Sequence, residues 1–516
     1  MQPTSQGRKR LHPDSDQESL PADGNEALDT VDTCNLQVSL PSGRCQAVNV
    51  PVSGTVCDLK MAAGRALKQP FLKLAGPDGR LLRLTDTLET AGLKDEDCVT
   101  AVARWPKVVA TSKAFALWCV GGDTVLSWGD REWGGDNTLV QNQLRNVQQI
   151  VATKHSFAAI LADESVTTWG DGDYGGDSTS VRHELKDVQR ICAADRAFAA
   201  IRADETVVTW GDPLAGGNSS QVRHELVTVR EVYAAMYAFA AVLANGTVVT
   251  WGMPEYGGDS SRVRYQLQNV QKVEATKYAF AAILLSGSVV TWGHPDYGGD
   301  SSSVSSQLRR VQQVHANRLA FAAILADGRV VTWGDQDSGG DSSAVQDQLR
   351  NTQQLSATNS AFAAILADRT VVTWGNRDWG GDSTAVQNQL RNVRQIKGAY
   401  FAFAAILADK SVVTWGDGQC GGDSTRVQAQ LKNVDSLYTA KSAFAAILGD
   451  QTVVTWGGRW CGGDSDRVQD QLQKVQQIYA TSSAFAAILE DGAIVTWGTV
   501  DHGGDCTAIQ EQLKHL

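Results

Sequence analysis

Apolar and polar positions over most of the chain repeat one pattern, which the last copy illustrates. A short run over 475–481 is followed by Ala484–Leu489, which is apolar on both faces, and then by Ala493–Trp497. Runs of this length and composition predict strands, and Asp491-Gly492 predicts a tight turn between the second and the third. Each copy is therefore expected to form three antiparallel strands.

A Trp-Gly pair marks each copy of the pattern. Its tryptophan recurs every 41 residues, at Trp128, Trp169, Trp210, Trp251, Trp292, Trp333, Trp374, Trp415, Trp456 and Trp497. Residues 107–516 thus hold ten units, and a constant period of this length is typical of a propeller or a solenoid. Ile509 and Leu513 stand four residues apart after a Gly-Gly-Asp sequence, which indicates a short helical connector.

The second strand of each unit has two apolar faces, and one sheet alone cannot bury both. Stacking against identical neighbours buries them, and the Ala-rich sequence of that strand lets neighbouring sheets approach closely. We therefore expect a mainly β fold in which ten three-stranded repeats with short helical connectors form a closed propeller or an open superhelical stack. The Asp of Gly-Gly-Asp is expected to cap a turn.

Residues 34–104 precede the repeats and show a different pattern. The predicted elements are strands over Cys34–Leu40, Gln46–Val52, Phe71–Leu74, Leu81–Leu84 and Cys98–Ala103, and a helix over about 56–68 that starts after the N-cap Thr55. This order resembles the ubiquitin-like β-grasp, an α+β fold. No Gly-Gly terminus follows the last strand, so we expect a fixed docking domain rather than a conjugated tag.

Residues 1–33 are expected to form a disordered tail, because they are polar, acidic and almost without large apolar side chains. Within them, Arg8-Lys9-Arg10 is either a nuclear-import patch or a solvated charge cluster. The whole chain has 42% hydrophobic residues, 20% charged residues and a net charge of −11, which argues against a nucleic-acid or anionic-membrane surface.

The absence of targeting signals and the pattern of cysteines indicate in which cellular compartment the protein is expected. No apolar run of membrane-spanning length occurs, and the N-terminus lacks the apolar stretch of a secretory signal, so neither is expected. The nine cysteines contain no Cys-x-x-Cys motif, which argues against a disulfide framework or a structural zinc site. We therefore expect the protein in the cytoplasm, the nucleus or both.

Motifs for enzyme chemistry are incomplete. His183-Glu184 and His224-Glu225 each begin a zinc-hydrolase motif, but no second His follows. Residues 170–177 resemble a calcium loop, but the other units lack the same acids. One position of consecutive units reads Cys420, Cys461 and His502. The expected spacing of neighbouring sheets is too wide for these three side chains to share a metal. We therefore expect no catalytic residue, no metal site and no cofactor.

The segment AFAAILADGRVVTWGD, residues 320–335, resembles the repeat of the regulator-of-chromosome-condensation family. The 41-residue unit is similar to that of the compact bacterial members. The Gly-x-x-His that often precedes the second strand in those families is absent, and ten units stand in place of the usual seven. The resemblance implies a β-propeller that acts as a non-enzymatic protein-interaction scaffold.

Two alternatives follow from the same resemblance. Repeats of this family occur in large ubiquitin ligases, so a ubiquitin-like segment beside them implies partners in the ubiquitin pathway. The alternative is a regulatory subunit, such as a small-GTPase exchange factor or a ubiquitin-ligase-associated factor. We expect no ligase domain after the repeats, because only Lys514-His515-Leu516 follow Leu513 in the sequence.

Two windows differ most between the units: the pair of residues before Ala-Phe, and the residues that follow Trp-Gly. The expected strand directions place both windows at one end of the array. Aromatic residues on loops are typical anchors of protein-binding faces. The candidate partner-binding residues are Trp133, Tyr174, Tyr256, Tyr297, Trp379, Tyr237, Tyr278 and Phe401. The competing interpretation is that these rings only fill gaps between the sheets.

Overall fold

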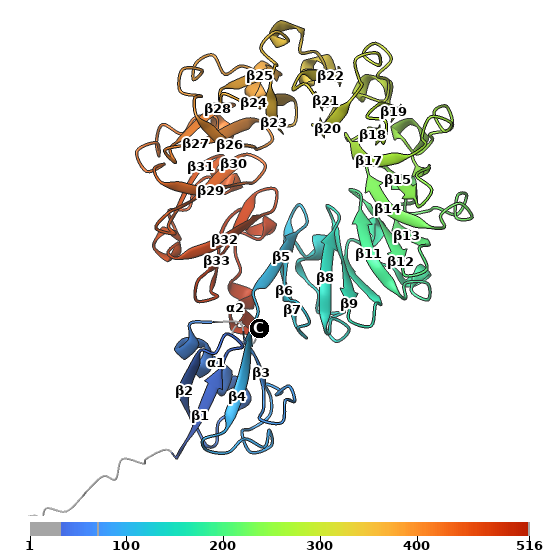
Figure 1. The fold of residues 1–516 in the computed structure, drawn as a ribbon. Coiled ribbons are helices and arrows are strands. Elements are labelled where there is room, and N and C mark those ends of the chain that lie inside the picture. Colours follow the sequence, from blue (N-terminus) through green and yellow to red (C-terminus); the bar gives the residue numbers. More distant parts are fainter. Residues whose placement is uncertain (1–31, 70–71, 514–516) are drawn as a thin grey trace, which may run out of the picture.

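The computed structural model describes residues 32–69 and 72–513 (Figure 1). Nearly all of the expected tail 1–33, its Arg8-Lys9-Arg10 patch and the first residue of the predicted strand Phe71–Leu74 lie outside the described residues. Within the described part, no helix is both long enough and apolar enough to cross a membrane.

The N-terminal part is a four-stranded mixed sheet with one helix. Its elements are β1 (Thr33–Ser39), β2 (Cys45–Pro51), α1 (Val56–Leu67), β3 (Leu72–Ala75) and β4 (Cys98–Ala103). The strand order is β2-β1-β4-β3, with β1 and β4 parallel and the other two pairs antiparallel. As the sequence predicts, Thr55 caps α1, because its side chain accepts from the backbone N–H of Asp58 and the Asp58 carboxylate accepts in return.

One predicted strand of this part is absent. Residues 81–84 form no strand, since Leu81 makes only an isolated bridge with Ala75. The chain after Leu82 turns toward the start of α1, where the carbonyl oxygen of Leu84 accepts from the backbone N–H of Cys57. The segment therefore packs against the helix start instead of extending the sheet.

The repeats form ten separate three-stranded antiparallel sheets. The first strands are β5 (Pro106–Ala110), β8 (Val147–Ala152), β11 (Val188–Ala193), β14 (Val229–Ala234), β17 (Val270–Ala275), β20 (Val311–Ala316), β23 (Thr352–Ala357), β26 (Val393–Gly398), β29 (Val434–Thr439) and β32 (Val475–Ala480). The second strands are β6 (Ala114–Cys119), β9 (Ser156–Leu161), β12 (Ala197–Arg202), β15 (Ala238–Leu243), β18 (Ala279–Leu284), β21 (Ala320–Leu325), β24 (Ala361–Leu366), β27 (Ala402–Leu407), β30 (Ala443–Leu448) and β33 (Ala484–Leu489). The third strands are β7 (Val125–Gly129), β10 (Val166–Gly170), β13 (Val207–Gly211), β16 (Val248–Gly252), β19 (Val289–Gly293), β22 (Val330–Gly334), β25 (Val371–Gly375), β28 (Val412–Gly416), β31 (Val453–Gly457) and β34 (Ile494–Gly498).

Short helical turns join the sheets. Those after Trp-Gly are Arg131–Gly135, Gly172–Tyr174, Pro213–Ala215, Pro254–Tyr256, Pro295–Tyr297, Gln336–Gly340, Arg377–Gly381, Gly418–Cys420, Arg459–Cys461 and Val500–His502. Further turns cover Thr179–Val181, Ser343–Val345, Gln469–Gln471 and Thr507–Ile509, and the last runs into α2 (Gln510–Leu513). The predicted capping role of the Gly-Gly-Asp carboxylate is confirmed, since Asp177 Oδ1 accepts from the backbone N–H of Thr179 at 2.8 Å.

The second strand of each sheet is buried on both faces, as its sequence predicts. In the third repeat, Phe198 pairs in register with Trp210, and the two rings stack with their centroids 5.0 Å apart. The Phe ring is fully buried, and the Trp indole N–H donates to the carbonyl oxygen of Gly175 in the preceding repeat at 3.1 Å. Each repeat Trp thus packs within its own sheet and bonds to the neighbouring one.

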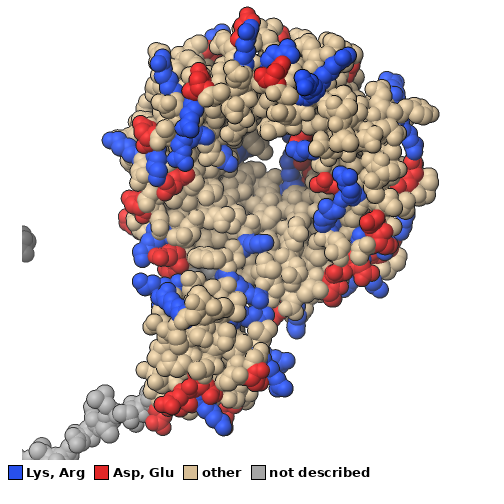
Figure 2. Space-filling model, viewed as in Figure 1, with Lys and Arg blue, Asp and Glu red and all other residues tan. Residues whose placement is uncertain are grey.

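The first and last repeats contact each other as consecutive repeats do. The indole N–H of Trp128 donates to the carbonyl oxygen of Gly503 at 3.1 Å, which is the same bond as in the other repeats. Strand β32 contacts β5 just as β5 contacts β8. No sheet closes on itself, but the array of sheets returns to its start, and the ten first strands surround a central opening (Figures 1 and 2). This arrangement is consistent with a propeller.

The N-terminal part joins the ring through a short connection. Only Arg104 and Trp105 separate β4 from β5, which begins one residue before the predicted start of the repeats. The Arg104 guanidinium donates to the carbonyl oxygen of Val120 in the first repeat. The N-terminal part has a core of its own, which includes Leu36 and Leu59 and is separate from the clusters of the repeats.

Candidate protein-binding face

Both variable windows lie at one end of the ring, as the strand directions predict. The second strand starts where the third strand ends, so that Ala279 pairs with Gly293 at this end of the fifth sheet. A hydrogen bond joins the two windows, since the Thr276 hydroxyl donates to the carbonyl oxygen of Tyr297 at 3.1 Å. Side chains from both windows therefore meet on one surface.

Eight of these side chains form a continuous series, which we call the aromatic arc. Its members are Trp133, His155, Tyr174, Arg196, Tyr237, Tyr256, Tyr278 and Tyr297, from the first five repeats. The ring centroids of Trp133 and His155 are 4.0 Å apart, and those of His155 and Tyr174 are 4.6 Å apart. The Arg196 guanidinium lies 4.8 Å from the centroid of Tyr174 and 5.7 Å from that of Tyr237, and so continues the series where Ala215 provides no ring.

The second half of the arc consists of tyrosines. The centroid of Tyr256 lies 5.6 Å from that of Tyr237 and 4.8 Å from that of Tyr278. Tyr278 and Tyr297 follow at 5.1 Å. Distances of this size are those of interacting aromatic pairs. Six of the eight predicted binding residues thus lie in one connected series, which ends after Tyr297 because the sixth repeat has Leu319 and Ser338 at the corresponding positions.

The other two predicted residues form a separate pair. Trp379 and Phe401 have their centroids 4.8 Å apart in edge-to-face geometry, and Tyr400 lies 6.0 Å from Phe401. The structure therefore divides the predicted set into the arc and this pair, separated by the sixth repeat, which has no aromatic residue at either window position.

Three further residues of this end were not among the predicted ones. Lys113 lies over the Trp133 ring at 4.4 Å, and His294 stacks on Tyr297 at 4.5 Å. Trp460 is 79% exposed and follows Arg459, whose guanidinium is 5.9 Å from the indole. Lys113 occupies in the first repeat the position that Tyr237 occupies in the fourth, so its place in the first variable window is the sequence signal that marks it.

The imidazole of His155 is held between two rings and is half-buried. Burial lowers the pKa of His155, and the Arg196 and Lys154 cations act in the same direction, while Asp171 and Asp195 oppose them. Its Nδ1 atom is buried and has no hydrogen-bond partner among the described residues. The imidazole is therefore expected to be neutral at pH 7 and to act in the arc as an aromatic ring.

The incomplete chemical motifs have structural roles. Glu184 pairs with Arg223 of the next repeat, and Glu225 pairs with Arg264. Asp171, from the calcium-like loop, accepts from the backbone N–H of Asp173 at 3.1 Å and so caps a turn.

Cys420, Cys461 and His502 lie at the same end of the ring as the arc. Within residues 32–69 and 72–513, they do not assemble into a group of three metal ligands. The Cys461 thiol instead lies 3.6 Å from the Ser483 hydroxyl. The nine cysteines all lie in the described residues, and the structure forms no disulfide between them.

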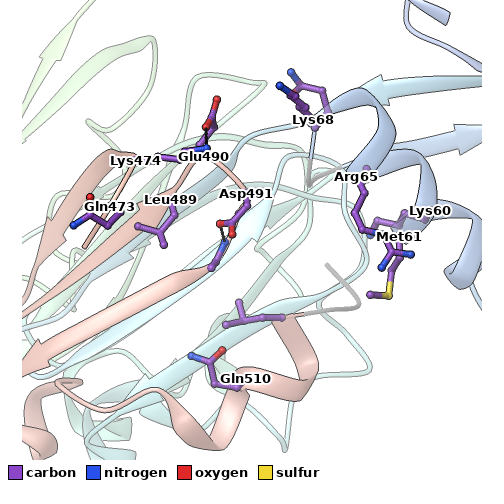
Figure 3. A pocket seen from close by; sticks show the side chains of 15 residues that line it. Lys60, Met61, Arg65, Lys68, Gln473, Lys474, Leu489, Glu490, Asp491 and Gln510 are labelled. Carbon is purple, nitrogen blue, oxygen red and sulfur yellow. Dashed lines mark hydrogen bonds and ion pairs between the residues drawn. The ribbon is translucent and has the colours of Figure 1, made fainter. Parts of the chain in front are cut away.

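A groove of about 650 Å³ lies between α1 and the last repeat (Figure 3). Helix α1 contributes Lys60 and Arg65, and the turn after β33 contributes Glu490 and Asp491. Lys474 of the last repeat also lines the groove and pairs with Glu490, so the wall of the last repeat is acidic only at Asp491, opposite a basic α1. This mixture of charges fits a contact between the two parts of the chain better than a site for a ligand of one sign.

No protein-family model matches the chain, and no curated protein matches it. Solved structures do match. Prp20p from Saccharomyces cerevisiae is 15% identical over 61% of this chain and 83% of its own, with a TM-score of 0.32. The CRINKLY WD40 ectodomain of the Arabidopsis thaliana receptor kinase ACR4 is 17% identical over 51% of this chain and 93% of its own, with a TM-score of 0.29. The computationally designed Ika8 protein is 14% identical over 68% and 96%, with a TM-score of 0.28. Similarity at this level supports no statement about function.

Proposed function

We propose that this protein is a non-enzymatic protein-interaction scaffold whose partner binds the end of the ring that carries the aromatic arc. The observation that carries the proposal is the arc itself, a connected series of rings across five repeats. Large aromatic side chains are the residues whose loss most weakens protein interfaces. No hydrogen bond to described residues holds the tyrosine hydroxyls of the arc, and none of them is buried without a partner, so they face solvent.

The repeats themselves argue against rings that serve only to fill gaps. Ala215 and Ser338 occupy the position of Tyr174 in their own repeats, where they are buried at 0% and 4% exposure. Those two repeats form the same three-stranded sheets as the others. The fold therefore does not need an aromatic ring at this position, which favours a role in binding.

The test is partner capture by matched variants. Tyr297→Ala and Trp379→Ala are each expected to weaken partner binding about tenfold or more, which corresponds to the loss of an interface anchor. Tyr265 is 91% exposed and lies outside the arc, so Tyr265→Ala is the control and should bind as the unmodified protein does. If Tyr297→Ala and Trp379→Ala unfold the protein, the rings are structural and the proposal is wrong.

For the N-terminal part, the proposal is a ubiquitin-like β-grasp docking domain over 34–104, with partners in the ubiquitin pathway. The sheet order β2-β1-β4-β3, the parallel pair β1–β4 and the separate core support this. Limited proteolysis should cut within 1–33 and near 104–107, and early cuts spread evenly through the repeats would contradict two separate domains. Nine cysteines without a disulfide between them fit the proposed location in the cytoplasm or nucleus.

A pull-down with the two separated parts distinguishes the scaffold from a regulatory subunit. Capture of ubiquitin-pathway proteins by residues 34–104 supports the scaffold. Nucleotide-dependent capture of a small GTPase by residues 107–516 would instead support an exchange factor.

A further inference from the structure

One residue from each repeat lines the mouth of the central opening at the end that carries the arc. We call this ring of ten the rim: Ser112, Lys154, Asp195, Met236, Lys277, Arg318, Asn359, Tyr400, Lys441 and Ser482. Two adjoining hollows of about 370 and 530 Å³ are together lined by all ten. In sequence, each rim residue is the first member of the variable pair that precedes the second strand, as Lys154 and His155 precede β9.

Backbone hydrogen bonds hold the rim together. In nine of the ten steps the backbone N–H of one rim residue donates to the carbonyl oxygen of the next, as from Lys277 to Arg318 at 3.0 Å. The step from Ser482 to Ser112, also 3.0 Å, joins the last repeat to the first. Strands bonded in this way lie about 4.8 Å apart, so a ring of ten measures about 15 Å between opposite backbones. Long side chains from opposite sides therefore reach toward the same axis.

The rim is basic, although the chain as a whole has a net charge of −11. It contains the four cations Lys154, Lys277, Arg318 and Lys441 and a single carboxylate, Asp195. That carboxylate already pairs with Lys154.

The other three cations have no such partner. Within the described part of the chain, no carboxylate lies within ion-pair distance of Lys277, Arg318 or Lys441, and the Lys441 ammonium lies 5.4 Å from the Tyr400 ring. Lysine and arginine side chains appear around the opening in the space-filling view (Figure 2).

The cations surround the opening on three sides. Lys154 stands three repeats before Lys277, and Lys441 stands three repeats after Arg318 and three before Lys154 around the ring. Their fields overlap at Lys277, whose pKa is lowered to about 8, first by burial and then by the charges of Lys154, Arg318 and Lys441, while Asp195 acts in the opposite direction. An anion placed among them would relieve this repulsion.

We propose that the rim binds an acidic segment of the protein partner, a loop or terminus that presents at least three carboxylates. This inference rests on the proposed function and names the chemistry of the partner. The opening runs through the ring, so it admits a chain segment longer than the rim is deep (Figure 2). An extended segment also directs successive side chains to opposite sides, which suits cations that stand around an axis better than one compact phosphate does. The arc lies directly outside the rim and would contact the rest of the same partner.

The experiment uses the full chain and a fluorescein-labelled hexaglutamate peptide, with fluorescence anisotropy as the readout. Saturable binding is expected, and it should weaken as salt is raised because exposed charges are screened. The double variant Lys277→Gln/Arg318→Gln should weaken binding at least tenfold, while Lys277→Arg keeps the charge and should retain it. Lys432 is exposed and distant from the rim in the repeat, so Lys432→Gln is the control and should bind normally.

Three outcomes would decide against the proposal that the rim binds an acidic segment. Absence of saturable binding, or equal binding by the double variant with an unchanged circular dichroism spectrum, overturns it. If inorganic tripolyphosphate binds the rim and hexaglutamate does not, the site serves a small phosphate ligand and the acidic-segment assignment is wrong. The peptide experiment needs no partner, so its result is independent of Tyr297→Ala: if hexaglutamate binds but Tyr297→Ala leaves partner capture unchanged, the proposed arc fails while the rim stands.

Discussion

Closure of the ring in solution is tested by two tryptophans that have the same surroundings in the structure. Trp374 bonds to the carbonyl oxygen of Gly339 in the preceding repeat at 3.0 Å, whereas Trp128 of the first repeat bonds to Gly503 of the last at 3.1 Å. The two indoles are 5% and 3% exposed. If the first and last repeats meet in solution, Trp128→Phe and Trp374→Phe should destabilise the protein equally.

The magnitude follows from what the substitution removes. Phe lacks the indole N–H, so a buried glycine carbonyl oxygen loses its donor, at a cost of about 1–3 kcal/mol. The smaller ring also leaves a void, and at about 24 cal/mol per Å³ of residual cavity this adds roughly 1 kcal/mol. Each variant should therefore lose about 2–4 kcal/mol of unfolding free energy.

Urea unfolding followed by circular dichroism measures both variants against the unmodified protein. Trp105→Phe is the control, because Trp105 is 49% exposed in the connection before the repeats, and its midpoint should not change. A clearly smaller fall of the midpoint for Trp128→Phe than for Trp374→Phe would refute the closed ring, since in an open stack Trp128 has no acceptor to lose.

Two further predictions concern the loop after Trp-Gly and its capping carboxylate. Gly421 has φ +101°, and a Cβ there would meet the Phe444 ring at 2.5 Å, so Gly421→Ala should lower the melting temperature by several degrees, while Gly418→Ala, where the nearest atom is 3.5 Å away, should change it little. The pKa of Asp382 is lowered to about 2, first by hydrogen bonds from Thr384 and then by Arg377. Its folded pKa lies below its unfolded value of about 3.9, so its contribution to stability is present above about pH 4 and is lost as the pH falls toward 2. Urea midpoints between pH 5 and pH 2 should fall less steeply for Asp382→Asn, and identical pH profiles would contradict this role.

The strand plan of the repeats could be predicted from the sequence because it depends on local periodicity. The run Ala320–Leu325 is apolar at every position, and the structure buries it on both faces. The predicted strand over 81–84 was wrong because its residues serve the start of α1, a contact that alternation of apolar residues cannot indicate.

The candidate site was only partly predictable. Tyr256 and Tyr278 lie in the two variable windows of consecutive repeats, so the six aromatic members of the arc that are Trp or Tyr could be anticipated from the sequence, whereas His155 and Arg196 were not among the predicted residues. The rim could not be predicted from the sequence, because Lys154 and Lys441 approach the same opening only if the last repeat returns to the first. That return depends on the angle between neighbouring sheets, which no single repeat encodes in its pattern of apolar residues.

Because the ring closes with ten complete sheets, the number of repeats can change during evolution. Each sheet is built from three consecutive strands of one unit, and the last sheet borrows no strand from the N-terminal end. Loss or duplication of one 41-residue unit, as recombination between near-identical repeats produces, would leave every remaining sheet intact. Only the angle between neighbours, about 36° for ten equal steps, would have to adjust. A change in the number of units would therefore change the width of the opening while the contact between neighbouring sheets stays the same.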